Sequence, residues 1–373
     1  MDLKRREFIT ASLVALVAAC TKASATKPDI ILGGGQYILP QSQSLQYVLS
    51  VVDVSNRTKT LTPMRFLAHG IHWNPVDENR LAIFEKKGPH ACEYDLQSQQ
   101  VVREIPKRDG HYFYGHGAYS AEGSLLFSTE TELKQLNGVI AVRDSKSLDY
   151  LEAFPSYGKE PHECKLIDDG QTLVVTNGGG LMKGEPPSVT YIEVKTQQLL
   201  ERVELTNHKL NAGHIAISDK GDIVVVSAPR LGREKQGVGG ISIRADGIEL
   251  ESMGNPAAVT NRMRGEALSV VIHDEANIAA VTHPDGGMVT FWSIKEKQLL
   301  KVVNLPHPRG VTMVADETAF LISYGRDASL VSVLVEGLLL QEDQTMHSSY
   351  ITGSHIYNWS RGMKELYYPR GMS

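Results

Sequence analysis

A short segment that usually contains a histidine recurs along the chain, and this repetition constrains the fold more than any other feature of the sequence. The histidine occupies five of the repeated positions: His69, His116, His162, His214 and His355. The same frame passes through Glu266 and Gly310 without a histidine, and successive positions lie 47, 46, 52, 52, 44 and 45 residues apart. A period in the mid-forties is typical of β-propeller blades, so seven positions predict seven blades.

Each repeat carries the pattern of a four-stranded blade. In the third repeat, the turn at residues 168–170 precedes an apolar run at 173–176, and further strand-like runs cover 189–194 and 199–205. Turn residues between strand-like segments at this spacing are typical of hairpins. The polar stretches between the runs are interpreted as loops: 178–188, 232–240 and 251–264. The pattern predicts an all-β, seven-bladed propeller of the WD40-like or YVTN-like kind.

The two ends of the repeat array predict how the ring closes. Only one further strand fits after His355, at residues 356–360. Three strand-like runs precede the first repeat, at 30–32, 47–54 and 60–66. A last blade built from the N-terminal strands plus the C-terminal strand would remove the exposed edges of an open array. Residues 26–373 are therefore expected to form a single propeller.

Residues 1–25 have the pattern of an export signal. Arg5 and Arg6 form the twin-arginine pair, and an uncharged apolar run follows at 13–19. The run is too short for a membrane span, which needs about 20 apolar residues. It ends in a lipobox-like Val-Ala-Ala-Cys in which Cys20 would be lipidated, whereas cleavage after Ala25 in Ala-Ser-Ala would release a soluble protein. Both endings predict a periplasmic protein, attached to the membrane only through a lipid on Cys20.

Composition narrows the classes of partner. The formal net charge is −5, the pI is near 6.2, and no block of Lys and Arg lies outside the leader. This balance argues against nucleic acid as a partner. Cys92 and Cys164 remain after the leader. An oxidising compartment permits a disulfide between them, but two cysteines do not form a disulfide framework. We expect a monomer.

The repeated histidines are the candidate metal ligands. Because they hold equivalent positions ahead of the innermost strands, their side chains are expected to ring one water-filled mouth of the central channel. The predicted metal set adds the equivalent acidic residue: His69, His116, His162, His214, Glu266 and His355. Imidazoles beside a carboxylate suit Zn, Fe or Mn as well as Cu, and we expect Fe or Cu rather than Zn. The channel width favours binding by adjacent members or by a small cluster. The alternative is a structural role, in which each imidazole hydrogen-bonds a neighbouring blade's backbone.

Other residues near the repeat positions are weaker candidates. Arg264 and Arg309 precede the two repeats without histidine and would hold an anionic ligand or pair with Glu266. His307 lies in the loop before its blade and would reach the channel. Cys164 is expected on the same strand face as His162, as a soft ligand or, more commonly, a buried structural cysteine.

The remaining signals are negative or structural. His72 is interpreted as packing within its blade. The glycine runs 33–35 and 178–180 precede no predicted helix, which argues against phosphate binding. No hydrolase, zinc-protease or haem-attachment motif is present, so catalytic residues stay unknown and an enzyme is not the favoured reading.

The leader and the histidine-punctuated repeats together resemble DUF1513, an uncharacterised family of bacterial β-propellers exported by the twin-arginine route. The motifs that carry the resemblance are Arg5-Arg6, Gly-His-Gly at 115–117, Glu-Pro-His-Glu at 160–163 and Ala-Gly-His at 212–214. The resemblance implies association with imelysin-type iron-uptake proteins and a role in iron or copper handling at the cell envelope. A more distant likeness is to the propeller of nitrous-oxide reductase, but that enzyme's cupredoxin copper motif does not occur, so reductase activity is not implied.

Three functions are compatible with these features. The first is a module that binds or relays a transition metal in the envelope, with other iron-uptake proteins as partners. The second is a non-enzymatic scaffold whose faces bind a protein while the channel is structural. The third, less favoured, is an enzyme of the lactonase or quinoprotein kind with an organic ligand at the channel mouth.

Overall fold

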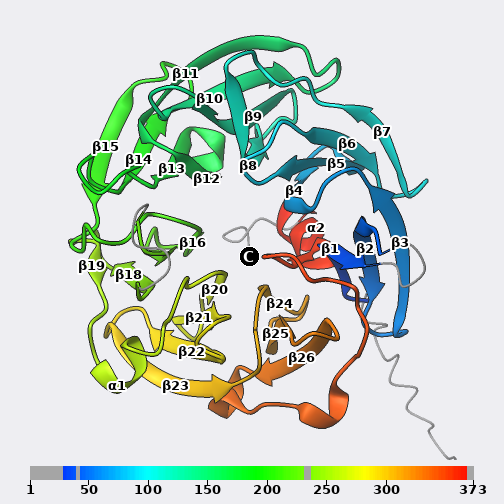
Figure 1. The fold of residues 1–373 in the computed structure, drawn as a ribbon, viewed down its shortest axis with the longest axis vertical. Coiled ribbons are helices and arrows are strands. Elements are labelled where there is room, and N and C mark those ends of the chain that lie inside the picture. Colours follow the sequence, from blue (N-terminus) through cyan, green and yellow to red (C-terminus); the bar gives the residue numbers. More distant parts are fainter. Residues whose placement is uncertain (1–27, 39–42, 231–236, 368–373) are drawn as a thin grey trace, which may run out of the picture.

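The computed structural model describes residues 28–38, 43–230 and 237–367 (Figure 1). It confirms the seven-bladed propeller: seven antiparallel sheets surround a central channel. The predicted export signal with Arg5, Arg6 and Cys20 lies outside the described residues, as does part of the predicted loop 232–240. Within the described ranges, no helix is long and apolar enough to cross a membrane.

The first four blades each contain four strands in chain order from the channel outward. Blade 1 comprises β4 (Ala68–Asn74), β5 (Asp77–Glu85), β6 (Ala91–Asp95) and β7 (Gln100–Glu104). Blade 2 comprises β8 (His111–Tyr119), β9 (Leu125–Glu132), β10 (Asn137–Asp144) and β11 (Tyr150–Lys159). Blade 3 comprises β12 (Pro161–Ile167), β13 (Thr172–Asn177), β14 (Ser188–Glu193) and β15 (Leu199–Glu204), with the 3-10 turn η1 (Asp168–Gly170). Blade 4 comprises β16 (Ile215–Ile217), β17 (Ile223–Ser227), β18 (Gly240–Arg244) and β19 (Glu251–Ser252).

The last three blades complete the ring. Blade 5 comprises β20 (Val270–His273), β21 (Ile278–His283), β22 (Met288–Ser293) and β23 (Gln298–Asn304). Blade 6 comprises β24 (Val311–Met313), β25 (Ala319–Tyr324) and β26 (Ser329–Leu334). Blade 7 comprises β27 (Tyr357–Asn358), β1 (Ile30–Ile38), β2 (Leu45–Asp53) and β3 (Thr58–Met64).

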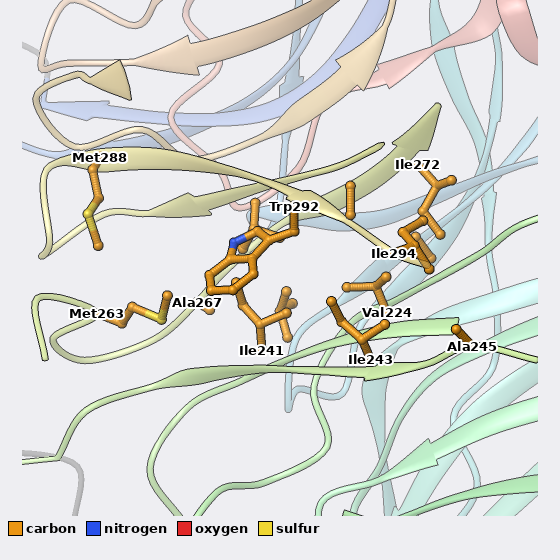
Figure 2. Packing of buried hydrophobic residues seen from close by; sticks show 14 residues of the cluster. Val224, Ile241, Ile243, Ala245, Met263, Ala267, Ile272, Met288, Trp292 and Ile294 are labelled. Carbon is orange, nitrogen blue, oxygen red and sulfur yellow. The ribbon is translucent and has the colours of Figure 1, made fainter. Parts of the chain in front are cut away.

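The core lies between neighbouring sheets. The middle strand β13 is buried along its whole length, whereas the outer strand β15 is largely exposed. The middle strands are therefore rich in apolar residues, because both faces of each sheet pack on a neighbouring blade. Figure 2 shows one such contact, in which the Trp292 ring of blade 5 lies beside Ile241 of blade 4.

In the closing blade, a short C-terminal strand pairs with the N-terminal strands. β27 lies antiparallel to β1, with Leu32 opposite Tyr357, and is shorter than the predicted strand 356–360 because helix α2 (Trp359–Tyr367) begins within that range. Glycines in β1 allow both β4 and the chain at 350–355 to lie against the sheet. A Cβ on Gly34 would lie 2.1 Å from the carbonyl oxygen of Ala68 in β4, and one on Gly35 would lie 1.9 Å from that of Tyr350.

Two further predictions about the blades need correction. Blade 6 has three strands, not four. The segment after β26 forms the 3-10 turns η2 (Glu336–Leu338) and η3 (Glu342–Gln344), and joins the sheet only through isolated bridges. The predicted loop 251–264 contains β19 and the short helix α1 (Ala257–Thr260). The sequence did not predict these turns, the short strand β19 or the helix α1, because each has too few residues to show a periodic pattern of apolar side chains.

A repeated threonine connects the inner strands of neighbouring blades. The Thr129 hydroxyl on β9 lies 3.1 Å from the His116 carbonyl oxygen and 3.2 Å from that of His162, so it can donate to either. Thr176 on β13 repeats this arrangement by donating to the Gly213 carbonyl oxygen at 2.6 Å. These buried bonds fix the backbone that carries the repeated histidines.

Replacing this threonine is expected to weaken the ring at the histidine level. Thr129→Val keeps the shape but leaves buried carbonyls without their donor, which costs about 1–3 kcal/mol. Urea unfolding followed by circular dichroism measures the change. Ser227→Ala is the control, because the buried Ser227 hydroxyl has no hydrogen-bond partner within the described residues. An equal loss of stability in the two variants would contradict the bridging role.

Candidate metal centre

Five imidazoles from five blades converge on the axis of the channel. His69, His116 and His162 lie on β4, β8 and β12, His214 directly precedes β16, and His355 lies two residues before β27. Their ring centroids lie between 4.1 and 6.1 Å apart in the pairs that make contact. All five residues are buried, with exposed fractions between 1% and 8%. The repeat therefore gathers five titratable side chains in one protected volume.

Glycines next to the histidines make room for this convergence. Gly115 has a φ of +136°, in the region that favours glycine, and a Cβ there would lie 2.6 Å from Cδ2 of His69. Only a residue without a side chain leaves space for the neighbouring imidazole. The Gly-His-Gly at 115–117 is thus a packing requirement of the cluster.

The ring nitrogens approach one another closely. One ligand atom each from His69, His116, His162 and His214 forms a group in which all atoms lie within 4.8 Å. Nε2 of His214 lies 2.9 Å from Nε2 of His162, 3.4 Å from Nε2 of His69 and 2.8 Å from Nε2 of His355. His214 is the centre of these contacts.

Hydrogen bonding among the imidazoles does not account for this arrangement. Nδ1 of His214 lies 2.6 Å from the Leu268 carbonyl oxygen, to which it must donate, so Nε2 of the neutral ring carries a single lone pair. That lone pair cannot accept fully from three neighbours. In addition, both ring nitrogens of His116 and Nδ1 of His162 are buried without a partner among the described residues. Buried polar atoms in this state call for an explanation, such as a bound ion.

Electrostatics keep these imidazoles neutral at neutral pH. Burial lowers the pKa of all five well below the usual value, and charge on neighbouring imidazoles or on Lys86 lowers it further. Neutral imidazole is the form that ligates metals.

The spacing of the nitrogens fits a shared transition metal. With metal–nitrogen distances of about 2.0–2.1 Å, two ligand nitrogens lie about 2.8–3.0 Å apart at a right angle and about 3.3–3.4 Å apart at a tetrahedral angle. The observed 2.8, 2.9 and 3.4 Å fall at these values. The bond from His214 to Leu268 supplies the outer-shell contact that orients metal-bound histidines.

The expectation of adjacent members or a small cluster agrees with the four grouped histidines, which belong to the consecutive blades 1 to 4. Two details differ from the expectation: a 2.8 Å contact also joins blades 4 and 7 across the channel, and the rings are buried rather than at a water-filled mouth. The reason is that every imidazole points inward from an inner strand or its preceding loop, which narrows the channel. The predicted structural bond also exists, since Leu268 belongs to the segment leading into blade 5.

Glu266 lies beside this cluster but is not one of the four residues grouped within 4.8 Å. It is partly exposed and lines a cavity of about 170 Å³ together with His162 and His214. The other side chains around the cavity include Lys86, Lys87, Tyr114 and Glu160. The cavity therefore adjoins two of the imidazoles, those of His162 and His214.

The other candidates are spread around this region. Arg309 donates from Nε to the Gly353 carbonyl oxygen at 3.0 Å; burial lowers its pKa, while Glu266 acts in the opposite direction. Arg264 and His307 are exposed. His72 packs against Phe84 and accepts a hydrogen bond from the Gly117 amide at 3.1 Å, in keeping with a packing role.

The cysteines are structural. Cys164 lies in a hydrophobic cluster with Phe127 and Phe154, away from the imidazoles. A register shift in β12 between Pro161 and Cys164 breaks the alternation that predicted one face for His162 and Cys164. Cys92 belongs to a different cluster, and both thiols are free and buried.

Sequence reasoning missed Lys86 and Lys87, which lie next to the histidines. A signal for them exists, because a hairpin brings the end of its second strand beside the start of its first. Ala68 at the start of β4 pairs with Glu85 at the end of β5, so the residues after Glu85 lie at the level of His69.

Comparison with solved structures shows the fold. The propeller is similar to Kuenenia stuttgartiensis hydrazine synthase, with a TM-score of 0.60 and 14% identity over 84% of this chain and 98% of that chain. It is also similar to the dihydro-heme d1 dehydrogenase NirN in complex with DHE, with a TM-score of 0.55 and 13% identity over 94% of this chain and 79% of that chain. No curated protein sequence matches the chain.

Family membership follows from the sequence. The family model described as "Protein of unknown function (DUF1513)" matches residues 62–350, which span all strands of blades 1 to 6 and the end of β3, the outermost strand of blade 7. The match covers every repeated histidine except His355. The chain belongs to the DUF1513 family.

Proposed function

We propose that the protein is a periplasmic metal-binding propeller that holds iron or copper in the buried imidazole cluster and serves metal uptake or handling at the cell envelope. The observation that carries the proposal is the convergence of four histidine ligand atoms within 4.8 Å, with His355 in contact with His214. Export by the twin-arginine route, anchoring through Cys20 and partnership with iron-uptake proteins are parts of the proposal that rest on the leader and on the family resemblance.

The donor set suits iron or copper, because imidazole is a ligand for both metals. His69, His116, His162 and His214 would hold the ion, and His355 lies beside them in contact with His214. An ion bound there would supply Lewis acidity or one-electron redox chemistry. The residues of the chain hold the imidazoles neutral, orient His214 through Leu268 and bury the cluster.

Metal analysis tests this proposal. Protein exported through its own leader, purified without chelator or affinity histidines, is expected to contain close to one equivalent of iron or copper. His162→Ala/His214→Ala is expected to lose the metal, because His214 contacts three other ligands. Elemental analysis gives the content, and circular dichroism checks folding. His307→Ala, which removes an exposed histidine, is the control and should keep the metal.

The metal is also expected to stabilise the fold. A ligand present at about 1,000 times its Kd stabilises a protein by about 4 kcal/mol. Chelation should therefore lower the melting temperature of the wild type and leave that of the double variant unchanged. Wild-type protein that contains no metal, even after reconstitution with Fe²⁺ or Cu²⁺, would overturn the proposal and favour the interaction scaffold.

A further inference from the structure

The cavity beside the imidazole cluster is small and polar. Its volume of about 170 Å³ lies below the roughly 300–1,000 Å³ typical of pockets for organic ligands. His162 and His214 form part of its wall, and charged groups from blades 1 and 2 and from the segment before blade 5 form other parts. Its size suits a ligand of a few atoms.

Two neighbouring lysines line this cavity in different states. Lys87 lies 3.3 Å from a carboxylate oxygen of Glu160 and 4.9 Å from the centroid of the Tyr114 ring. Lys86, in contrast, forms no salt bridge or side-chain hydrogen bond with the residues that the structure describes. The cavity therefore contains one ammonium group whose charge is balanced by contact and one whose charge is not.

The charge of Lys86 is felt by the imidazoles of the cluster. After burial, it is among the causes that lower the pKa of His69, His116, His162 and His355. Burial lowers the pKa of Lys86, while the charge of Glu266 acts in the opposite direction. A positive group thus faces ligands that carry no negative charge of their own.

The charges favour an anion in the cavity. Neutral imidazoles leave the charge of a bound metal ion uncompensated, and Lys86 adds another positive charge. Glu160 is paired with Lys87, so Glu266 is the remaining carboxylate of the cavity wall. With a metal ion bound, the net charge around the cavity is positive. A positive site attracts an anion more strongly at low dielectric constant than in bulk water.

We infer that the cavity binds a small anion, a carboxylate or inorganic oxyanion, against Lys86 and beside the imidazole cluster. The inference rests on the proposed metal centre and names the class of ligand that the centre takes. Lys86 provides the charge that selects the anion, and the size of the cavity excludes larger ligands.

Azide binding to Cu²⁺-loaded protein tests the inference. Copper is chosen because nitrogen ligands bind it most tightly among the divalent first-row ions. Copper content is measured first in each protein. Azide is then titrated while its charge-transfer absorption is recorded, and formate is added as a competitor to test for carboxylates. We expect saturable binding in the wild type and a rise in apparent Kd of at least about tenfold in Lys86→Met, which corresponds to about 1.4 kcal/mol.

Lys87→Met is the matched control, since it removes the adjacent charge that Glu160 already balances. Its apparent Kd for azide should change less than about threefold. Equal azide affinity in wild type and Lys86→Met, with copper content unchanged, would overturn the anion site and leave the metal centre intact. A wild-type protein that takes up no copper or iron would overturn the metal centre and the anion site together.

Discussion

We expect the metal-free protein to unfold as the pH falls from about 6.5 to 5, well before ordinary carboxylates titrate. The cause is the buried cluster: burial, above all, lowers the pKa of its five imidazoles in the folded state. In the unfolded chain a histidine titrates near 6.5. Between these values the unfolded state binds more protons, so the free energy of unfolding falls as the pH falls.

The expected size is large. The stabilisation is fully present above the unfolded pKa, and each imidazole that stays neutral in the fold removes about 1.4 kcal/mol per pH unit below it. Five such groups approach about 7 kcal/mol per pH unit, against a total stability of about 5–15 kcal/mol for typical proteins. Burial also lowers the pKa of His72 to about 4 and that of His283 to about 3, which adds to the slope.

Urea titrations in the presence of chelator at several pH values between 7.5 and 5 measure this slope. His116→Gln should make the slope shallower by about 1.4 kcal/mol per pH unit, because it removes one titrating imidazole. The substitution breaks no hydrogen bond of the ring, since neither ring nitrogen of His116 has a partner within the described residues. His307→Ala should leave it unchanged. Bound metal is expected to move the transition to lower pH, since it holds the neutral imidazoles. Stability independent of pH over this range would contradict the neutral, buried cluster.

Arg143→Met is expected to destabilise the protein by about 3–5 kcal/mol. Arg143 and Glu130 are both buried in blade 2, with 0% and 1% of their side chains exposed, and Nη2 lies 2.7 Å from the carboxylate. Arg143 also donates to Ser128 Oγ at 2.7 Å and to the Pro106 carbonyl oxygen at 2.9 Å. Removing the guanidinium leaves the Glu130 charge buried without its close partner.

The double variant Arg143→Met/Glu130→Gln is expected to recover a large part of this loss, because it removes both charges. Chemical unfolding of the two single variants and the double variant gives the coupling between the sites. Arg65→Ala is the control, since its ion pair with Glu104 is exposed and should contribute less than about 1 kcal/mol. Losses that simply add in the double variant would show that the pair is not coupled.

The sequence predicted the fold because propeller blades repeat in the chain. The run predicted at 173–176 lies within β13, and the run at 199–205 differs from β15 by one residue. Elements that depend on their neighbours were missed. β27 has two residues and exists through its pairing with β1, and α2 follows it directly. The three-stranded form of blade 6 likewise depends on the path of the chain after β26.

The candidate site was predictable in part. Equivalent positions in the repeat predicted that the histidines lie at one level of the channel, and they do converge there. The intervals carry no information on channel width, so the contact between His214 and His355 across the axis was not foreseen. The departure of Cys164 from the face of His162 depends on a register shift that no residue pattern revealed.

By itself, the sequence determined the number of blades and the positions that carry imidazoles, because both are properties of order along the chain. The tertiary structure alone decided which nitrogens meet, that they are buried, and that Lys86 and Glu266 share a cavity with them. These properties arise from closing the ring, which sets the width of the channel and brings groups from distant blades within a few ångströms. The chemistry proposed for the protein depends on those distances.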